Sequence, residues 1–98
     1  MDESRFHSLA DSCLADLADR IEAALGDEID VELQGGVMTL ALTDGGQYVV
    51  NKHGPNRQIW LSSPKSGASH FEFRDGFWRA TRVHDRTIED VLADELGF

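Results

Sequence analysis

Residues Tyr48 to Pro64 read YVVNKHGPNRQIWLSSP, which predicts two strands facing each other across a short turn. Alternation groups the apolar side chains on one face, as is typical of a core: Tyr48, Val50, Ile59 and Leu61. The other face receives Val49, Asn51, Gln58 and Trp60. An indole beside two carboxamides is unusual on a merely solvated surface, and it indicates a docking patch. Gly54 and Pro55 place the turn within Lys52–Arg57.

An amphipathic helix is predicted upstream of this pair, from about Glu3 to Leu25, because apolar residues recur there at spacings of three and four. The apolar stripe consists of Phe6, Leu9, Ala10, Cys13, Leu17, Ile21 and Ala24. Cys13 on this stripe is expected to be a buried thiol that packs as a small hydrophobe. Gly26 is placed to cap the helix at its C-terminus.

Period-two alternation begins after the helix and predicts further strands. Residues 29–34 form the first, with Ile29, Val31 and Leu33 inward, and Gly35-Gly36 forms a hairpin turn. Residues 37–42 form the second, with Met38, Leu40 and Leu42 inward. Residues 62–69 are predicted as a loop, followed by strands at 70–74 and 77–82. Trp78 is expected to pack against the helices.

A second helix is predicted over Thr87–Leu96, opened by Thr87 and Asp90 as a capping box. Short linked strands favour antiparallel pairing. The predicted fold is therefore α+β, a two-layer sandwich in which both helices pack on one face of a five- to six-stranded antiparallel sheet. We expect residues 1–98 to form a single domain.

Negative charge is concentrated in the first third of the chain. The net charge is −9, and residues 1–32 hold ten acidic residues against Arg5 and Arg20. Such a field repels nucleic acid and anionic lipid and attracts cations and basic protein surfaces, so neither nucleic acid nor membrane is an expected partner. Like-charge neighbours such as Asp16, Asp19 and Glu22 cost the helix a few tenths of a kcal/mol per pair, by a rough estimate.

Cys13 is the only cysteine, which excludes an internal disulfide and fits a reducing compartment. The chain begins at Met1 with no apolar or Arg-rich leader. We expect a location in a bacterial cytoplasm, or in the mitochondrial matrix for a mature organellar form.

Asn51, Pro55, Gln58 and the run Trp60–Pro64 together resemble the signature of the frataxin family. The acidic opening helix, the Gly35-Gly36 turn and the closing helix are also similar to that family in order and spacing. The resemblance implies weak surface binding of iron, Fe2+ or Fe3+, and a role in iron–sulfur cluster assembly. It also implies docking on the cysteine desulfurase and on the scaffold protein.

Carried over by residue, the resemblance assigns iron to an acidic ridge that consists of Asp11, Asp16, Asp19, Glu22, Asp27, Glu28, Asp30 and Glu32. His7 is a candidate nitrogen ligand beside the ridge. The face that meets the partner corresponds to Asn51, Gln58 and Trp60. Carboxylate oxygen suits iron, a fairly hard cation, so exposed acids could hold it without enclosing it. His70 stands where eukaryotic members tend to have arginine.

Other interpretations of the same residues stay open at this stage. The acids could form a face that serves solubility alone, or an interaction surface unrelated to metal. An enzymatic alternative is a ferroxidase that oxidises Fe2+ at the ridge, which needs carboxylates close enough for two irons or an oligomer that shares ligands. We expect a monomer, with iron-driven oligomerisation as the alternative. His53, His70 and His84 lack metal-ligand spacing.

Overall fold

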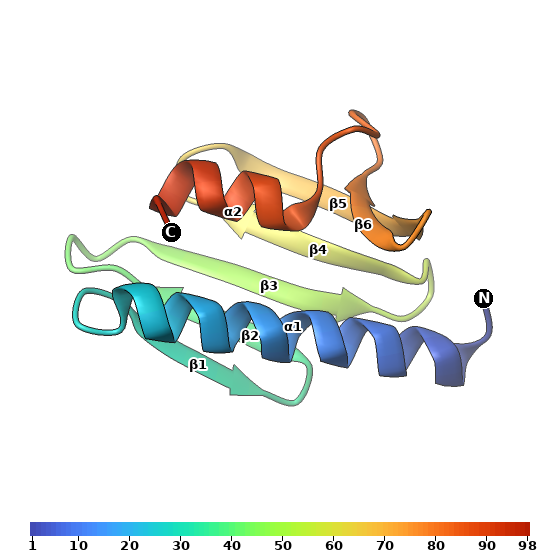
Figure 1. Ribbon diagram of the computed structural model, residues 1–98, viewed down its shortest axis with the longest axis horizontal. Helices are drawn as coiled ribbons and strands as arrows, with labels where there is room; N and C mark the ends of the chain where they lie inside the picture. The colour runs from blue at the N-terminus through green and yellow to red at the C-terminus, as the bar shows by residue number, and fades with distance from the viewer.

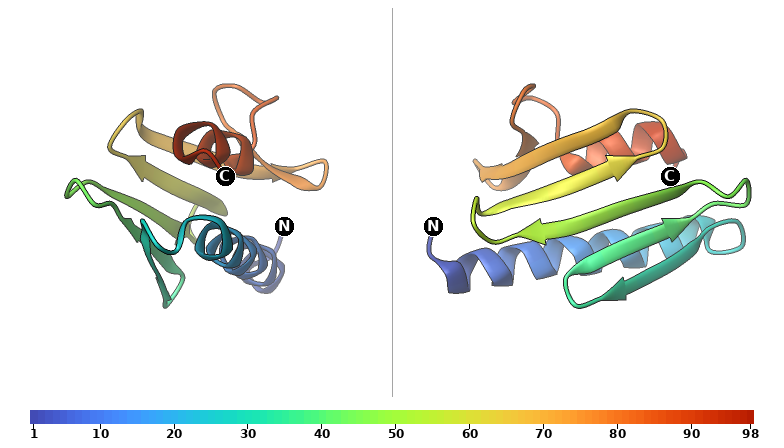
Figure 2. Two further views of the ribbon diagram at one scale, coloured as in Figure 1. Left: turned by 60° about the vertical axis from the view of Figure 1, so that its left-hand side comes forward. Right: turned by 180° about the vertical axis from the view of Figure 1, so that it is seen from behind.

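Six strands and two helices make up the computed structural model, which describes residues 1–98 (Figure 1). Their order is α1 (Glu3–Leu25), β1 (Asp30–Gln34), β2 (Val37–Ala41), β3 (Gln47–His53), β4 (Gln58–Ser63), β5 (Gly67–Arg74), β6 (Phe77–Ala80) and α2 (Ile88–Leu96). The strands form one antiparallel sheet in the order β1 to β6, so each strand pairs with its neighbours in sequence. Both helices lie on the same face of this sheet, and the opposite face carries no helix (Figure 2). The predicted fold is confirmed.

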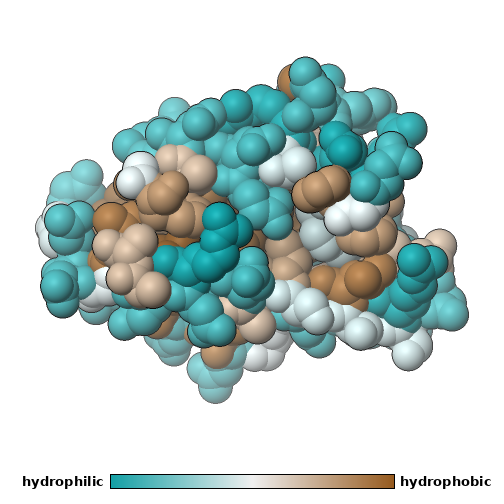
Figure 3. Space-filling view, viewed as in Figure 1, coloured by the Kyte–Doolittle hydropathy of each residue, from teal (hydrophilic) through white to brown (hydrophobic).

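The core lies between the helices and the sheet. Tyr48, Val50 and Ile59 are fully buried and Leu61 nearly so, as the alternation predicted. Trp78 packs edge-on against Phe6 of α1 and Phe73 of β5, which confirms its predicted place. Apolar side chains emerge between α1 and α2, while hydrophilic ones cover most of the rest of the helical face (Figure 3).

The buried face of α1 is rotated from the predicted stripe. Leu14 and Ala18 are buried although the stripe omitted them, and Ala24 is exposed although the stripe included it. Leu33 was also predicted inward but is 40% exposed, because β1 is the edge strand and its end extends past the apolar cover.

The glycine turn between β1 and β2 follows the prediction. Gly35 and Gly36 both have positive φ, 61° and 79°, as the tight hairpin requires. A side chain at Gly36 would also clash with Lys52, whose Cε would lie 2.5 Å from the added Cβ. Gly26 caps α1 as predicted, because its backbone N–H donates a hydrogen bond to the Glu22 carbonyl. Its backbone is in the right-handed helical region, with a φ of −59°.

Several predicted strand boundaries were wrong. β3 continues through His53, β5 begins at Gly67, and β6 ends at Ala80. The predicted loop at 62–69 shrinks to the turn at 64–66, because Ser63 pairs with Gly67 across it. The Ser63 hydroxyl accepts the backbone N–H groups of Lys65 and Ser66, which tightens this turn.

Glu95 of α2 holds the helix to the sheet. Its carboxylate accepts hydrogen bonds from the hydroxyls of Tyr48 (2.9 Å), Ser63 (2.5 Å) and Ser66 (2.6 Å). The Lys65 ammonium donates to the Glu95 backbone carbonyl at 2.8 Å. Burial opposes the charge on Glu95, but the three hydroxyl donors outweigh it and lower the pKa of the carboxyl. The first turn of α2 has the predicted capping box of Thr87 and Asp90.

Cys13 is predicted to react slowly in the folded protein. Burial, reinforced by the nearby charges of Glu89 and Asp16, raises the pKa of its thiol to about 12, so almost no thiolate exists at pH 8. We expect iodoacetamide to label Cys13 at pH 8 at least about 100-fold more slowly in native protein than in urea. Mass spectrometry of timed samples measures this. Equal rates in both conditions would contradict the buried placement.

Candidate metal ridge and docking face

The eight carboxylates of the acidic ridge all belong to exposed residues. They run along α1, through the turn that follows it, and onto β1, with Asp27 and Glu28 in the turn and Asp30 and Glu32 on the strand. α1 lies beside β1 and β2 at this edge of the molecule (Figure 1). The fold therefore brings the two acidic segments to one edge of the sheet.

Two ridge residues form ion pairs. Lys52 of β3 lies 2.8 Å from Asp11, and Arg20 lies 3.6 Å from Asp16 one helical turn away. The first contact places the Asp11 carboxylate beside the sheet. The other ridge carboxylates form no ion pair: Asp19, Glu22, Asp27, Glu28, Asp30 and Glu32. The open negative charge thus lies towards the C-terminal end of α1 and on β1.

His7 is engaged on both ring nitrogens. The Lys52 ammonium lies 3.1 Å from His7 Nδ1, and Glu3 lies 3.6 Å from Nε2. Because an ammonium can only donate, Nδ1 is the acceptor, and its lone pair is used by Lys52. Lys52 therefore occupies the position between His7 and Asp11 that a metal ion would need.

No three His, Cys, Asp or Glu side chains are grouped closely enough to hold one metal ion. Each point on the ridge offers a cation one or two carboxylates, and water would have to complete the coordination. This geometry suits weak, surface binding. It supplies no enclosed pair of sites for oxidising two irons.

Lys52 is predicted to suppress cation binding at the N-terminal end of the ridge. Removing its charge with Lys52→Gln frees Asp11, and we expect Mn2+ affinity there to rise about fivefold, the effect of roughly 1 kcal/mol. Paramagnetic broadening of the Asp11 amide in NMR spectra measures this, with Arg82→Gln as a control that removes one exposed positive charge belonging to none of the ion pairs. An unchanged Asp11 response in Lys52→Gln would show that Lys52 does not compete with the ion.

The three predicted docking residues come together on the outer face of the sheet, the face without helices. Asn51 of β3 lies directly opposite Trp60 of β4, and Trp60 lies opposite His70 of β5. The Trp60 indole N–H donates to the Gln58 carboxamide at 2.8 Å. The Asn51 carboxamide donates to the Lys52 carbonyl at 3.2 Å.

Two histidines that the sequence analysis left aside flank this tryptophan. The His53 ring stacks on one side of Trp60 with centroids 3.7 Å apart and planes 9° apart, and the His70 ring stacks at 4.2 Å and 8°. The two rings hold the indole upright and leave its edge for contact. We call the set Asn51, His53, Gln58, Trp60 and His70 the docking face. His53 lies two residues after Asn51, so alternation would have placed it on this face had the predicted strand continued past Asn51. His70 already began a predicted strand and precedes buried Phe71, so alternation alone placed it on the outer face.

The β1 end of the ridge and the docking face share one side of the sheet. Asp30 and Glu32 pair with Ala41 and Thr39, and Thr39 in turn lies opposite Val49, which belongs to the outer face. The β1 end of the ridge therefore bends around the edge of the sheet and points to the same side as Trp60. A single large partner could contact both surfaces.

Comparison with known proteins identifies the family. The frataxin-like domain matches residues 1–97. The chain belongs to the frataxin family. Members of this family are linked to iron binding and iron–sulfur cluster assembly.

Solved frataxins share the fold of this chain. Frataxin from Psychromonas ingrahamii is 25% identical, with a TM-score of 0.88 over 98% of this chain and 89% of that one. Trimeric frataxin from the yeast Saccharomyces cerevisiae, with its full-length N-terminus, is 42% identical, with a TM-score of 0.83 over 91% and 76%. The trimeric yeast protein complexed with ferrous iron is 42% identical, with a TM-score of 0.79 over 91% and 82%. In this frataxin neither helix is long and apolar enough to cross a membrane.

Proposed function

We propose that this frataxin is an iron-binding accessory protein of iron–sulfur cluster assembly that docks on the cysteine desulfurase and its scaffold protein. The observation that carries the proposal is the continuity between two surfaces. An exposed, mostly unpaired acidic ridge turns onto the side of the sheet that displays Trp60. The acids would meet a basic surface of the desulfurase or hold Fe2+ near it, and the docking face would meet the scaffold.

The mechanism is association rather than bond-making. Exposed carboxylates attract cations and basic surfaces over about 10 Å at moderate ionic strength, so docking should be fast and should weaken with salt. The docking face adds contact through an aromatic side chain, which salt does not screen. The indole is also ordered before binding, so it loses little side-chain entropy. We further propose that the chain is monomeric without iron, that iron can drive its oligomerisation, and that it acts in a bacterial cytoplasm or mitochondrial matrix.

Binding to the two partners tests this proposal directly. Purified protein is mixed with desulfurase and scaffold at low salt, with and without Fe2+ under anaerobic conditions, and calorimetry measures the affinity. We expect a complex at low salt and a loss of affinity of about tenfold between 50 and 300 mM NaCl. Absence of a complex in every condition would overturn the proposal.

Neutralising the middle of the ridge is predicted to stabilise the fold while weakening metal binding. In Asp19→Asn with Glu22→Gln, like-charge repulsion along α1 falls, and Glu22 no longer places a negative charge in the last helical turn. We expect the melting temperature to rise by about 3 °C, equivalent to roughly 0.5 kcal/mol. Fe2+ affinity should fall at least about threefold in anaerobic titrations.

The matched control for this double variant is Asp75→Asn with Asp85→Asn. It removes the same charge far from the ridge, and asparagine tolerates the positive φ of 53° at position 75. Loss of stability in the ridge variant would show that Asp19 and Glu22 chiefly hold the fold. Equal loss of iron binding in both variants would mean that net charge, rather than the ridge, attracts the metal.

A further inference from the structure

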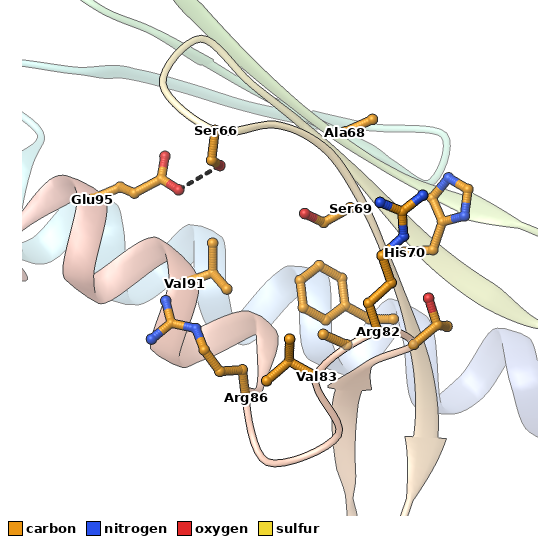
Figure 4. A pocket seen from close by; sticks show the side chains of 12 residues that line it. Ser66, Ala68, Ser69, His70, Arg82, Val83, Arg86, Val91 and Glu95 are labelled. Carbon is orange, nitrogen blue, oxygen red and sulfur yellow. Dashed lines mark hydrogen bonds between the residues drawn. The ribbon is translucent and has the colours of Figure 1, made fainter.

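A pocket that lies away from the ridge and adjoins the docking face only at His70 opens between β5, the segment from β6 to α2, and α2 itself (Figure 4). Its volume is about 480 Å³, within the range of small-molecule sites. The pocket exists because β6 has four residues and α2 has nine, so the start of β5 is left without a cover. The loop at residues 82–85 arches away from the sheet at this point, whereas Thr81 and Arg86 still form backbone hydrogen bonds with β5 and β6 (Figure 1).

Part of the pocket lining is apolar. Phe71 is fully buried beneath it, and Ala80 lies opposite Phe71 on β6, where a larger side chain would fill the space. Val83 and Val91 complete the lining from the two sides. Val83 is 50% exposed, which is unusual for an apolar side chain with a cavity beside it. These side chains offer a surface to an apolar body of about the size of one ring.

Among the polar side chains of the pocket lining, those of Ser69 and Arg82 have no partner in the protein. Ser69 faces the helical side of the sheet, in register with core residue Leu61, and points into the pocket in Figure 4. Ser63 and Ser66 both donate to Glu95, whereas the Ser69 hydroxyl has no partner in the protein. Arg82 is exposed and belongs to none of the ion pairs.

The remaining charges of the pocket are compensated. Arg86 donates to Asp94 at 2.7 Å, a contact that raises the pKa of the guanidinium. Glu95, at the end opposite Arg82, is held by the hydroxyls described above and remains ionised. One uncompensated positive charge and one fixed negative charge favour a ligand with a single negative charge directed at Arg82, and they disfavour a dianion.

We propose that this pocket binds a small organic monocarboxylate, whose carboxylate meets Arg82 and the Ser69 hydroxyl and whose apolar part covers Phe71 and Val83. A planar guanidinium matches a carboxylate with two parallel hydrogen bonds. In a chain of net charge −9, a free arginine above an apolar hollow is a place where an anion can bind. The site is separate from the ridge and does not depend on the function proposed above.

An NMR titration with benzoate tests the site. Benzoate carries the proposed charge and ring, benzamide keeps the ring without the charge, and phenyl phosphate adds a second charge. We expect benzoate to shift the amides of Ser69, Thr81 and Val83 saturably, and to bind at least about fivefold more tightly than either analogue. Binding of benzamide as tight as that of benzoate would overturn the role of charge, and tighter binding of phenyl phosphate would overturn the monocarboxylate assignment.

Variants of Arg82 and Ser69 distinguish benzoate binding in the pocket from nonspecific electrostatic attraction to the protein. Arg82→Gln should weaken benzoate binding about tenfold, and Ser69→Ala about threefold. Arg5→Gln removes one exposed positive charge on α1, which contributes no residue to the pocket lining, and should leave the affinity unchanged. Because Arg82 is exposed, its replacement should not change the melting temperature. Equal effects of Arg82→Gln and Arg5→Gln, or no saturable shift in the parent protein, would refute the site.

Discussion

Replacing Trp60 by alanine is expected to weaken binding to the desulfurase and scaffold complex by about 100-fold, which is typical of an aromatic hot spot. The indole is half-buried, stands on the bare face of the sheet, and is held on both sides by parallel imidazole rings. A side chain that is already ordered before binding contributes its contact area with little entropic cost. Calorimetry at low salt measures the loss.

The flanking histidines give a graded series. His53→Ala or His70→Ala leaves the indole in place but frees one of its faces, so we expect each to weaken binding about tenfold. Phe77→Ala is the matched control, because Phe77 is an aromatic side chain, 52% exposed, that lies opposite Arg74 on the outer face, away from the docking face. If Trp60→Ala and Phe77→Ala bound the desulfurase and scaffold complex with the same affinity, the docking face would not be the binding surface.

Glu95→Ala is expected to lower the free energy of unfolding by about 2–3 kcal/mol. We expect this to be the largest loss caused by replacing any charged residue of the chain. Three hydroxyl groups lose their acceptor, and two of them, on Tyr48 and Ser63, belong to buried residues. Urea unfolding followed by fluorescence measures the change. Glu95→Gln keeps one acceptor oxygen and should lose less. Aspartate 94 provides the control, since Asp94→Ala removes only the exposed pair with Arg86.

The same carboxylate gives a pH dependence with a defined sign. Because its pKa is lower in the folded than in the unfolded state, Glu95 stabilises the fold above the unfolded-state pKa of about 4.3. This contribution is lost as the pH falls through the lowered folded-state pKa. Stability should therefore decline more steeply with acid in the parent protein than in Glu95→Gln. If the unfolding free energies of the two proteins fell in parallel as the pH was lowered, the three hydroxyls would not be stabilising the charged form of Glu95.

The fold could be predicted from the sequence because its signals are local. The spacing of apolar residues defines α1, the glycine pair defines the first hairpin, and Thr87 with Asp90 defines the start of α2. The stretch Tyr48–Pro64 predicted both of its faces correctly, although its two strands continue two residues into the predicted turn on the β3 side. Alternation also predicted that Asn51, Gln58 and Trp60 share a face.

What the sequence did not predict depends on contacts between residues far apart in the chain. Ser63 looks like a loop residue until Glu95, 32 positions later, supplies its partner. His7 and Asp11 look like open ligands until Lys52 of β3 lies between them. The stacking of His53 and His70 on Trp60 requires three strands in register. Periodicity in one segment contains no information about these partners.

The most direct test of the central claim is a set of amide NMR spectra of labelled protein, recorded at low salt during addition of the desulfurase and scaffold complex. The account predicts that two groups of amides respond together, those of Asp19–Glu32 and those of Asn51, Trp60 and His70. It also predicts that anaerobic Fe2+ alone broadens only the first group. A complex that forms while both groups remain unperturbed, with the changes confined to α2 or β6, would contradict the claim.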